Sequence, residues 1–427
     1  MTTISHSQTI NAPLSGPTLI QHPKNRPIHI KLGKSFSVTG ETQYFVVGSN
    51  NVTIEGSKCA TVVVSYTGGV PYLGLVQNGN ISPFVRAYDC LTVKHIKITN
   101  DVTNAVPLAA YAGWIGQQHF GRNAKDVVIK ECTNNGPISN NNCGGIVGAY
   151  STCMVVECVN NCVIPLNIFS AGGIVGDSAD KTHAYKCKNT AMALIQGPYS
   201  GGIFGANVVG CSAKRCRNEA AISGEQAGGI FGGSDGRINQ NNACECKNSG
   251  AVTGPNAGGI FGNAQNTSSA FKCYNTGALT SPASGQIIGG IFGNNAVRCT
   301  AEACFNNSNM IGNVGGIFAD ANSCTARNCY NFGSLGTAGY GIICDASGGG
   351  NLIDECYVAS AAITTPVALN PIHPAATVST IVTKHVSGVS EATGEWRDRS
   401  ANKYLCGTDG TVWIRRCRNE PYKLNLC

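Results

Sequence analysis

A short glycine-rich motif that returns at a nearly constant interval constrains the fold of this chain more than any other feature. The pentapeptide is GGIFG or a near copy, and its first glycines are Gly144, Gly172, Gly201, Gly228, Gly258, Gly289 and Gly315. The steps between them are 28, 29, 27, 30, 31 and 26 residues. A glycine loop that binds a ligand is needed once, whereas a motif repeated at this period is typical of a stacked repeat architecture.

A second motif, Cys-x-Asn, keeps step with the pentapeptide. Its copies begin at Cys132, Cys158, Cys187, Cys216, Cys246, Cys273, Cys304 and Cys329, and Cys356 continues the cysteine column without the Asn. Within each unit, short runs of Val, Ile and Thr are bounded by Gly, Asn and Ser, which predicts strands and turns rather than helices. Three short strands per unit make one coil, so we predict an all-β, right-handed parallel β-helix (solenoid) with coils of about 25–31 residues.

The columns of like residues predict what fills the solenoid. The isoleucine column should stack inside, and it comprises Ile146, Ile174, Ile203, Ile230, Ile260, Ile291, Ile317 and Ile342. Asn suits turns, and stacked Asn amides can bond one another along the axis. The residue after each Ile, such as Phe204 or Phe318, leaves two alternatives open. A corner turns it inward, or it forms an exposed apolar stripe that would be an oligomer interface.

The repeat divides the chain into three parts. Residues 1–27 contain four prolines and are expected to form an N-terminal arm. Residues 28–360 are expected to form the β-helix, with regular repeats from about 130. The repeat then stops, and residues 361–427, which include Trp396 and Trp413, are expected to cap the open end of the solenoid.

Composition argues against several partners. The net charge is +7 and only 12% of residues are charged, without a basic cluster in the repeats, so no nucleic-acid partner is expected. No stretch approaches ~18 apolar residues, so no membrane insertion is expected. The first residues lack the basic and apolar regions of a signal peptide, which favours cytoplasmic synthesis in a reducing compartment, for example of a virion component.

The 22 cysteines are therefore expected to be mostly buried thiols. Four pairs share a Cys-x4-Cys spacing: Cys153/Cys158, Cys211/Cys216, Cys299/Cys304 and Cys324/Cys329. Two buried thiol columns, disulfides within each coil, and metal binding all remain open, although zinc ribbons use Cys-x2-Cys pairs. Cys244 and Cys246 alternate along a strand, so both cannot face the interior.

The units CKNSGAVTGPNAGGIFGNA (246–264) and CYNTGALTSPASGQIIGGIFGNN (273–295) resemble GLUG-type repeats, which occur in large adhesin-like surface proteins. The NVTIEG segment (51–56) is similar to the start of a coil in the pectin lyase-like β-helix superfamily. The resemblance implies an architecture shared with adhesins and viral fibre or spike proteins, and it implies no reaction. By the same resemblance, a homo-oligomer, most often a trimer, is expected.

Parallel β-helices often act on polysaccharides, so carboxylate clusters matter. The best cluster is Asp177 and Asp180 beside His183, and a weaker one is Asp354 with Glu355. Both suit solvated turns or edges, so we assign no catalytic, cofactor-binding or metal-binding residue and expect no cofactor. The predicted function is a structural or recognition rod with a glycan or cell-surface ligand. The alternative is a glycoside hydrolase or lyase.

Overall fold

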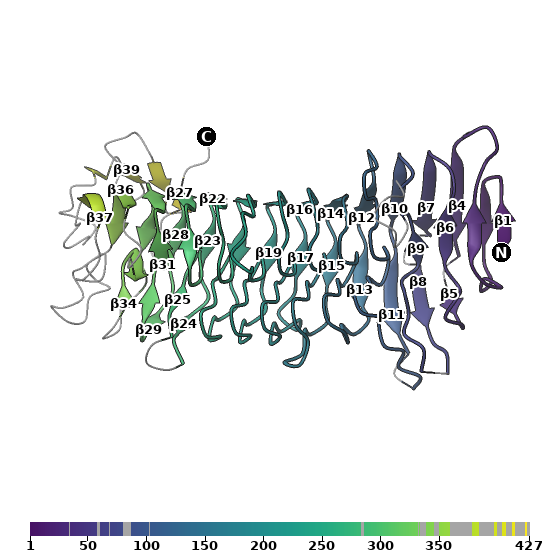
Figure 1. The fold of residues 1–427 in the computed structure, drawn as a ribbon, viewed down its shortest axis with the longest axis horizontal. Helices are drawn as coiled ribbons and strands as arrows, with labels where there is room; N and C mark the ends of the chain where they lie inside the picture. Colours follow the sequence, from purple (N-terminus) through teal and green to yellow (C-terminus); the bar gives the residue numbers. More distant parts are fainter. Residues whose placement is uncertain are drawn as a thin grey trace.

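The computed structural model shows a parallel β-solenoid of about 12 turns. It is a rod with the N-terminus at one end (Figure 1). The structure describes residues 1–33, 35–57, 60–67, 69–79, 87–101, 103–282, 286–331, 333, 339–345 and 350–358, and short strands between 378 and 424. Every element within these residues is a β-strand, which confirms the predicted all-β solenoid.

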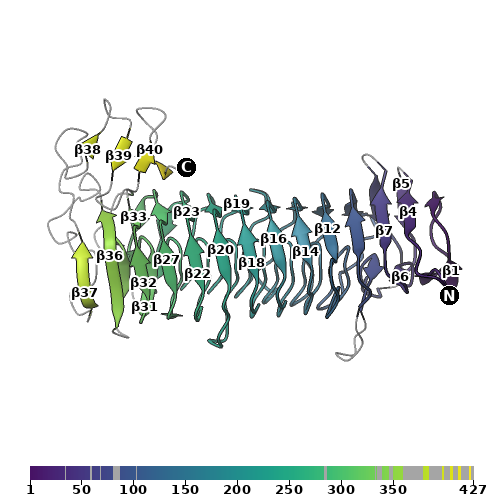
Figure 2. The same cartoon turned by 90° about the horizontal axis from the view of Figure 1, so that it is seen from above.

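The first sheet runs along the whole rod, with one strand from each coil (Figure 2). Its strands pair in parallel and in register, which stacks the same coil position along the axis. They are β2 (Gln8–Ile10), β4 (Ile28–Leu32), β7 (Val52–Gly56), β10 (Leu91–Lys94), β12 (Val128–Lys130), β14 (Met154–Val156), β16 (His183–Tyr185), β18 (Ser212–Lys214), β20 (Asn242–Cys244), β22 (Ser269–Phe271), β27 (Thr300–Glu302), β32 (Thr325–Arg327), β36 (Asn351–Val358) and β37 (Val378–Thr383).

The second sheet follows the first after a short corner, which is two residues long in the repeat coils, as at Glu131 and Cys132. Its strands are β5 (Ser35–Val38), β8 (Thr61–Val64), β11 (Lys97–Asn100), β13 (Thr133–Asn135), β15 (Val159–Asn160), β17 (Lys188–Asn189), β19 (Arg217–Asn218), β21 (Lys247–Asn248), β23 (Tyr274–Asn275), β28 (Phe305–Asn306) and β33 (Tyr330–Asn331). β36 pairs with both β32 and β33, so the two sheets merge at this strand.

A third wall closes the coil. It is a sheet at the N-terminal end, made of β1 (Thr2–Ile4), β3 (Thr18–Ile20), β6 (Phe45–Val47) and β9 (Val76–Gln77). Single bridges continue it through the repeats, for example Phe231 with Phe261. Short parallel sheets complete the later coils: β24 (Leu279–Thr280) with β29 (Met310–Ile311), β25 (Ile288–Gly289) with β30 (Val314–Gly315) and β34 (Gly339–Tyr340), and β26 (Ala296–Val297) with β31 (Phe318–Asn322) and β35 (Ile343–Asp345).

The corner between the first and second sheets is made by one residue with positive φ in each repeat coil. We call these residues the corner column, and they include Glu131, Glu157, Lys186, Arg215, Glu245 and Lys272, with φ between 52° and 56°. Left-handed backbone at a non-glycine residue is uncommon, and here it turns the chain from one sheet to the next. The cysteine that follows, such as Cys216, then points into the core.

Asparagine forms an unbroken ladder inside the rod. The eight Asn residues of the Cys-x-Asn motif are fully buried. In seven steps from Asn134 to Asn331, each side-chain Nδ2 donates to Oδ1 of the next coil's Asn at 2.7–2.9 Å. This confirms the predicted bonding along the axis and satisfies amides that would be costly to bury alone.

The Phe column points inward, so the exposed apolar stripe that we considered does not exist. The five rings of Phe204, Phe231, Phe261, Phe292 and Phe318 are fully buried and stack with centroids 4.6–4.8 Å apart. The neighbouring Ile side chains are buried too, because a sharp corner breaks the strand alternation. The prediction of a trimer therefore loses the interface that we had proposed for it.

Close approach explains the glycines of the pentapeptide. A Cβ on Gly228 would lie 2.0 Å from the carbonyl oxygen of Phe231, and one on Gly229 would lie 2.2 Å from the oxygen of Gly259 in the next coil. Both distances are impossible contacts for a side chain. The corner is thus too tight for any residue with a Cβ, although neither glycine has a positive φ.

The structure differs from the predicted arm, residues 1–27, and describes only part of the predicted cap, residues 361–427. Residues 1–27 do not form a separate arm, since β1 pairs with β3, β2 with β4 and β3 with β6, which makes these strands part of the first coils of the solenoid. Four prolines there lie mainly in the connections between strands. The predicted cap, 361–427, falls largely outside the described residues. Within it, β37 extends the first sheet, and β38 (Arg397–Asp398), β39 (Tyr404–Cys406), β40 (Val412–Ile414) and β41 (Lys423–Leu424) form an antiparallel sheet.

Candidate functional site

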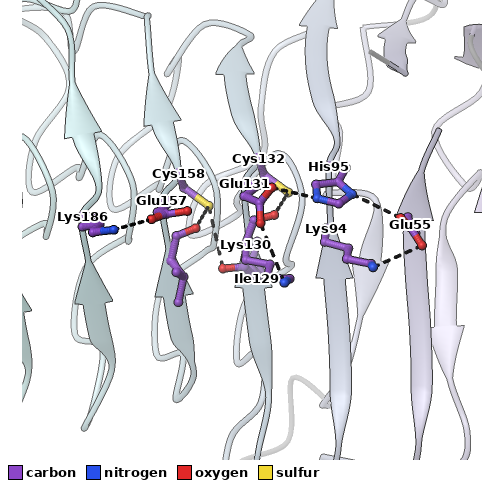
Figure 3. Close-up of polar contacts among 11 residues, drawn as sticks. Glu55, Lys94, His95, Ile129, Lys130, Glu131, Cys132, Glu157, Cys158 and Lys186 are labelled. Atoms are coloured by element: carbon purple, nitrogen blue, oxygen red, sulfur yellow. Dashed lines mark hydrogen bonds and ion pairs between the residues drawn. The ribbon is translucent and has the colours of Figure 1, made fainter. Parts of the chain in front are cut away.

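A network of charged side chains lies around the corner between the first two sheets (Figure 3). At its N-terminal end, Glu55 from β7 meets Lys94 and His95 from the next coil. The Lys94 Nζ lies 3.3 Å from Glu55 Oε2, and the His95 Nδ1 lies 3.2 Å from Glu55 Oε1. His95 Nε2 reaches Glu131 Oε2 at 2.8 Å, so one imidazole joins carboxylates on both neighbouring coils.

Glu55 is the most enclosed carboxylate of this network, and His29 also contacts it at 2.8 Å. Burial raises the pKa of Glu55, and hydrogen bonds from Lys94, His95 and His29 lower it. The net pKa lies below its ordinary value, so Glu55 stays ionised at neutral pH. These contacts connect charged side chains of adjacent coils.

Opposite charges continue along the corner column toward the C-terminal end. The Lys186 Nζ lies 2.9 Å from Glu157 Oε1, and the Arg215 Nε lies 2.6 Å from Glu245 Oε2. The ammonium of Lys186 also lies over the ring of Tyr185, at 5.3 Å from its centroid. The corner is thus a polar, exposed ridge that can recognise charged or hydroxylated ligands.

The structure separates the predicted cluster of Asp177, Asp180 and His183. Asp177 is 6% exposed, whereas Asp180 and His183 are exposed. Ser178 Oγ donates to Asp177 Oδ2 at 2.7 Å, and His183 instead contacts Ser212 Oγ at 2.7 Å. Burial raises the pKa of Asp177 to about 6. Within the described residues, no hydrogen bond joins the three, so they do not form one site.

The second predicted pair, Asp354 and Glu355, lies in β36, and its side chains fall outside the described part of the chain. A different pair was missed by the sequence reasoning. Asp320 of β31 and Asp345 of β35 are partners in register on adjacent coils. Burial, followed by the charge of Asp345, raises the pKa of Asp320 to about 6. Their 25-residue separation equals one coil, which is the signal that could have found them.

The thiols form two buried columns, as one of the open alternatives predicted. In the first column, from Cys158 onward, Sγ of each cysteine donates to a carbonyl of the preceding coil, for example Cys216 to Ala184 at 3.5 Å. Burial raises the pKa of Cys216 well above its ordinary range. The second column mixes Cys153, Cys211, Cys299 and Cys324 with polar residues such as Thr182.

The cysteines that the structure describes are free thiols, and no disulfide joins them. Cys246 is buried whereas Cys244 is partly exposed, as their alternation predicted. Among the described side chains, no group of three or more His, Cys, Asp or Glu is placed to hold a metal ion.

Some solved structures of other proteins have a backbone similar to that of this chain. No protein-family profile matches the chain, so the GLUG-type resemblance stays an expectation. No curated protein matches it in sequence either. The structure of PfbA, a surface adhesin of Streptococcus pneumoniae, is similar with a TM-score of 0.42 and 9% identity, over 92% of this chain and 90% of that one.

Two viral structures are also similar. ORF18 of Geobacillus virus E2 has a TM-score of 0.33 and 8% identity, over 95% of this chain and 61% of that one. Tailspike protein 3 of bacteriophage CBA120 has a TM-score of 0.27 and 9% identity, over 94% of this chain and 64% of that one. Within the described residues, no helix is long and apolar enough to cross a membrane.

Proposed function

We propose that the chain is a structural and recognition protein, a rigid rod that presents loops and surface columns as part of a fibre, spike, virion or surface adhesin. The observation that carries this proposal is the continuity of the interior. Asn amides bond one another without a gap from Asn134 to Asn331, and the Phe rings stack over five coils. Such ladders hold the outer face of every coil in a fixed relation to the next.

The outer face is where variation is tolerated. Loops after the pentapeptide differ in length between units, because the repeat steps vary from 26 to 31 residues. Loops on a rigid scaffold are the usual carriers of binding specificity. A glycan or cell-surface ligand suits this exposed, polar surface.

Self-association into a homo-oligomer, with a trimer as the favoured state, is part of the proposal but needs an interface other than the Phe column. Exposed apolar side chains are available on the loops of two consecutive coils, at Leu166 (69% exposed) and Met192 (70% exposed). Light scattering of the native protein gives the mass. A single species of 44.3 kDa would exclude the oligomer.

The proposal is tested by separating binding from turnover. The purified chain is applied to immobilised glycans, and the same glycans are assayed for newly released reducing ends. Binding without release supports a recognition protein. Release of reducing ends, or of unsaturated products, would contradict it.

A second candidate function, polysaccharide hydrolysis, is favoured by the Asp320–Asp345 pair. Two carboxylates on one face, one of them with a raised pKa, are what glycoside hydrolysis requires. If any hydrolysis is detected, Asp320→Asn should abolish it, with Asp180→Asn as the matched control several coils away along the rod. Activity that survives Asp320→Asn would exclude this pair as its source.

A further inference from the structure

Three basic residues occupy one column of the second sheet, on three consecutive coils. Lys188 of β17, Arg217 of β19 and Lys247 of β21 are direct partners in register on consecutive strands. Like charges placed directly opposite one another across paired strands are destabilising. The corner column next to them instead pairs opposite charges, as in Lys186 with Glu157.

The carboxylates near this column do not neutralise all of its positive charges. Lys188 pairs with Glu219 at 2.9 Å, and the Lys247 ammonium lies 5.5 Å from the ring centroid of Tyr274. Within the described residues, Arg217 has no ion pair, although it is exposed. Lys214, exposed on β18 of the same coil across the corner residue Arg215, adds a further positive charge. The central cation of the column, Arg217, thus keeps no ion pair within the described residues, and a local conflict of this kind is expected at a functional site.

We propose that this basic column, Lys188, Arg217 and Lys247 with Lys214 across the corner, binds a linear acidic polysaccharide laid along the axis of the rod. The proposal rests on the recognition function and names its ligand class. The column offers one cation per coil, and coils are spaced by ~4.8 Å. That spacing is close to the length of one extended sugar unit, so successive acidic sugars can each meet one cation.

A single-stranded nucleic acid is the competing polyanion, and the aromatic residues argue against it. Its bases need free ring faces on which to stack. Here the rings already carry an ammonium group over one face: Lys247 over Tyr274, and Lys186 over Tyr185. The surface therefore binds by charge, and a charged sugar chain suits it better than stacked bases.

The column also supplies a matched control. Lys97 of β11 occupies the same position in its coil, and Thr133 and Val159 separate it from Lys188 along the column. Lys97 is exposed, as Arg217 is. Arg217→Glu and Lys97→Glu therefore make the same change of charge at the same place in a coil, but only the first lies within the basic column.

The experiment measures binding of the full chain to immobilised dextran sulfate, with uncharged dextran and oligo-dT as comparison probes. We expect wild-type protein to bind dextran sulfate but not dextran, with an affinity that falls steeply as salt is raised. Arg217→Glu should weaken binding by about tenfold or more, and Lys97→Glu by less than about twofold, since charge complementarity is local. Because Arg217→Glu also relieves the repulsion, its melting temperature should equal or exceed that of wild type.

Three results would overturn the inference: no binding of wild type to dextran sulfate, equal losses for the two variants, or tighter binding to oligo-dT, which would assign the surface to nucleic acid. The melting temperature shows whether Arg217→Glu is folded, and Arg217→Gln serves as a second variant if it is not. Glycan recognition without reducing-end release, measured on uncharged glycans, can succeed when this inference fails. The two proposals can therefore fail separately.

Discussion

The same column of the second sheet is built in two ways in the two halves of the rod. In the N-terminal coils its inward residues are Phe36, Val62 and Ile98, and from Asn134 onward they are asparagines. All of them are fully buried. An apolar column needs only complementary shapes, whereas a polar column needs every member to have a partner. The asparagine ladder is therefore stable as a continuous run.

The interior of the N-terminal coils is correspondingly mixed. Trp114 and Tyr72 pack at 5.7 Å between ring centroids, and Phe36 packs on Phe45 at 6.2 Å. The repeat coils instead stack identical rings nearly parallel, as Phe261 on Phe292 with 1° between planes. The N-terminal coils thus specify their register by varied shapes, and the repeat coils specify it by repeated ladders.

The largest expected effect tests whether water is excluded equally from the interior of the N-terminal coils and from the interior of the repeat coils. Ile230→Asp and Ile54→Asp each bury an unpaired carboxylate, which costs about 3–5 kcal/mol of unfolding free energy in either half. Chemical denaturation of both variants provides the measurement. A loss below 1 kcal/mol for Ile230→Asp alone would show that the repeat interior admits water.

Interrupting the polar ladder should cost somewhat less. Asn248→Ala removes the partner of Asn218 Nδ2 and of Asn275 Oδ1, both fully buried, and should cost about 2–4 kcal/mol. Asn161→Ala is the control, because Asn161 is half-buried and outside the ladder, and it should cost about 1 kcal/mol or less. Equal losses for the two variants would mean that the ladder adds no stability of its own.

The junction of the two halves gives a sharper contrast. Ile98→Asn places an amide next to Asn134, whose side chain can pair with it, whereas Val62→Asn places one between Phe36 and Ile98. We expect Val62→Asn to be the more destabilising by about 1–3 kcal/mol, since its amide stays unsatisfied. Thermal unfolding of the two variants compares them directly, and the reverse order would show that the ladder cannot be extended.

The smallest expected effect on stability comes from a buried carboxylate of the repeat coils. Asp177 of the repeat coils has a pKa of about 6, raised from 3.8, so the folded state binds more protons than the unfolded state between about pH 4 and pH 6. Stability should therefore fall as pH rises through that window, by about 1–2 kcal/mol. Asp177→Asn should remove this dependence. Relative to wild type, the variant should therefore gain more stability at pH 7.5 than at pH 4.5. Denaturation curves at both pH values test this, and an unchanged pH dependence in the variant would assign the slope to other groups.

The sequence predicted the coils from residue 28 onward, in both the irregular and the repeating part, and misjudged residues 1–27. The Asn, Cys and Ile columns are visible because one residue type recurs at one position, and all three prove to be interior. Residues 1–27 lack those columns, so the sequence predicts an arm where the structure has short strands of the first coils. The direction of the Phe ring depends on a corner, and strict alternation could not decide it.

The charged surface was harder to foresee for a different reason. The basic column needs the register of β17, β19 and β21, and its members are 29 and 30 residues apart in a chain whose repeat length varies. The same holds for Asp320 and Asp345. Only the pairing of strands brings these residues together, whereas the Asp177 cluster is close in sequence and separated by the fold.

The central claim, that repeated columns form the interior of the rod, is tested most directly by mapping thiol reactivity residue by residue. Native protein is labelled with iodoacetamide without reductant, then denatured and labelled with a heavier analogue, and each cysteine is read by mass spectrometry. We predict rapid native labelling of exposed Cys90 and protection of the buried column from Cys132 to Cys356, with full labelling after denaturation. Native labelling of that column at the rate of Cys90, or few free thiols in the denatured protein, would contradict the account.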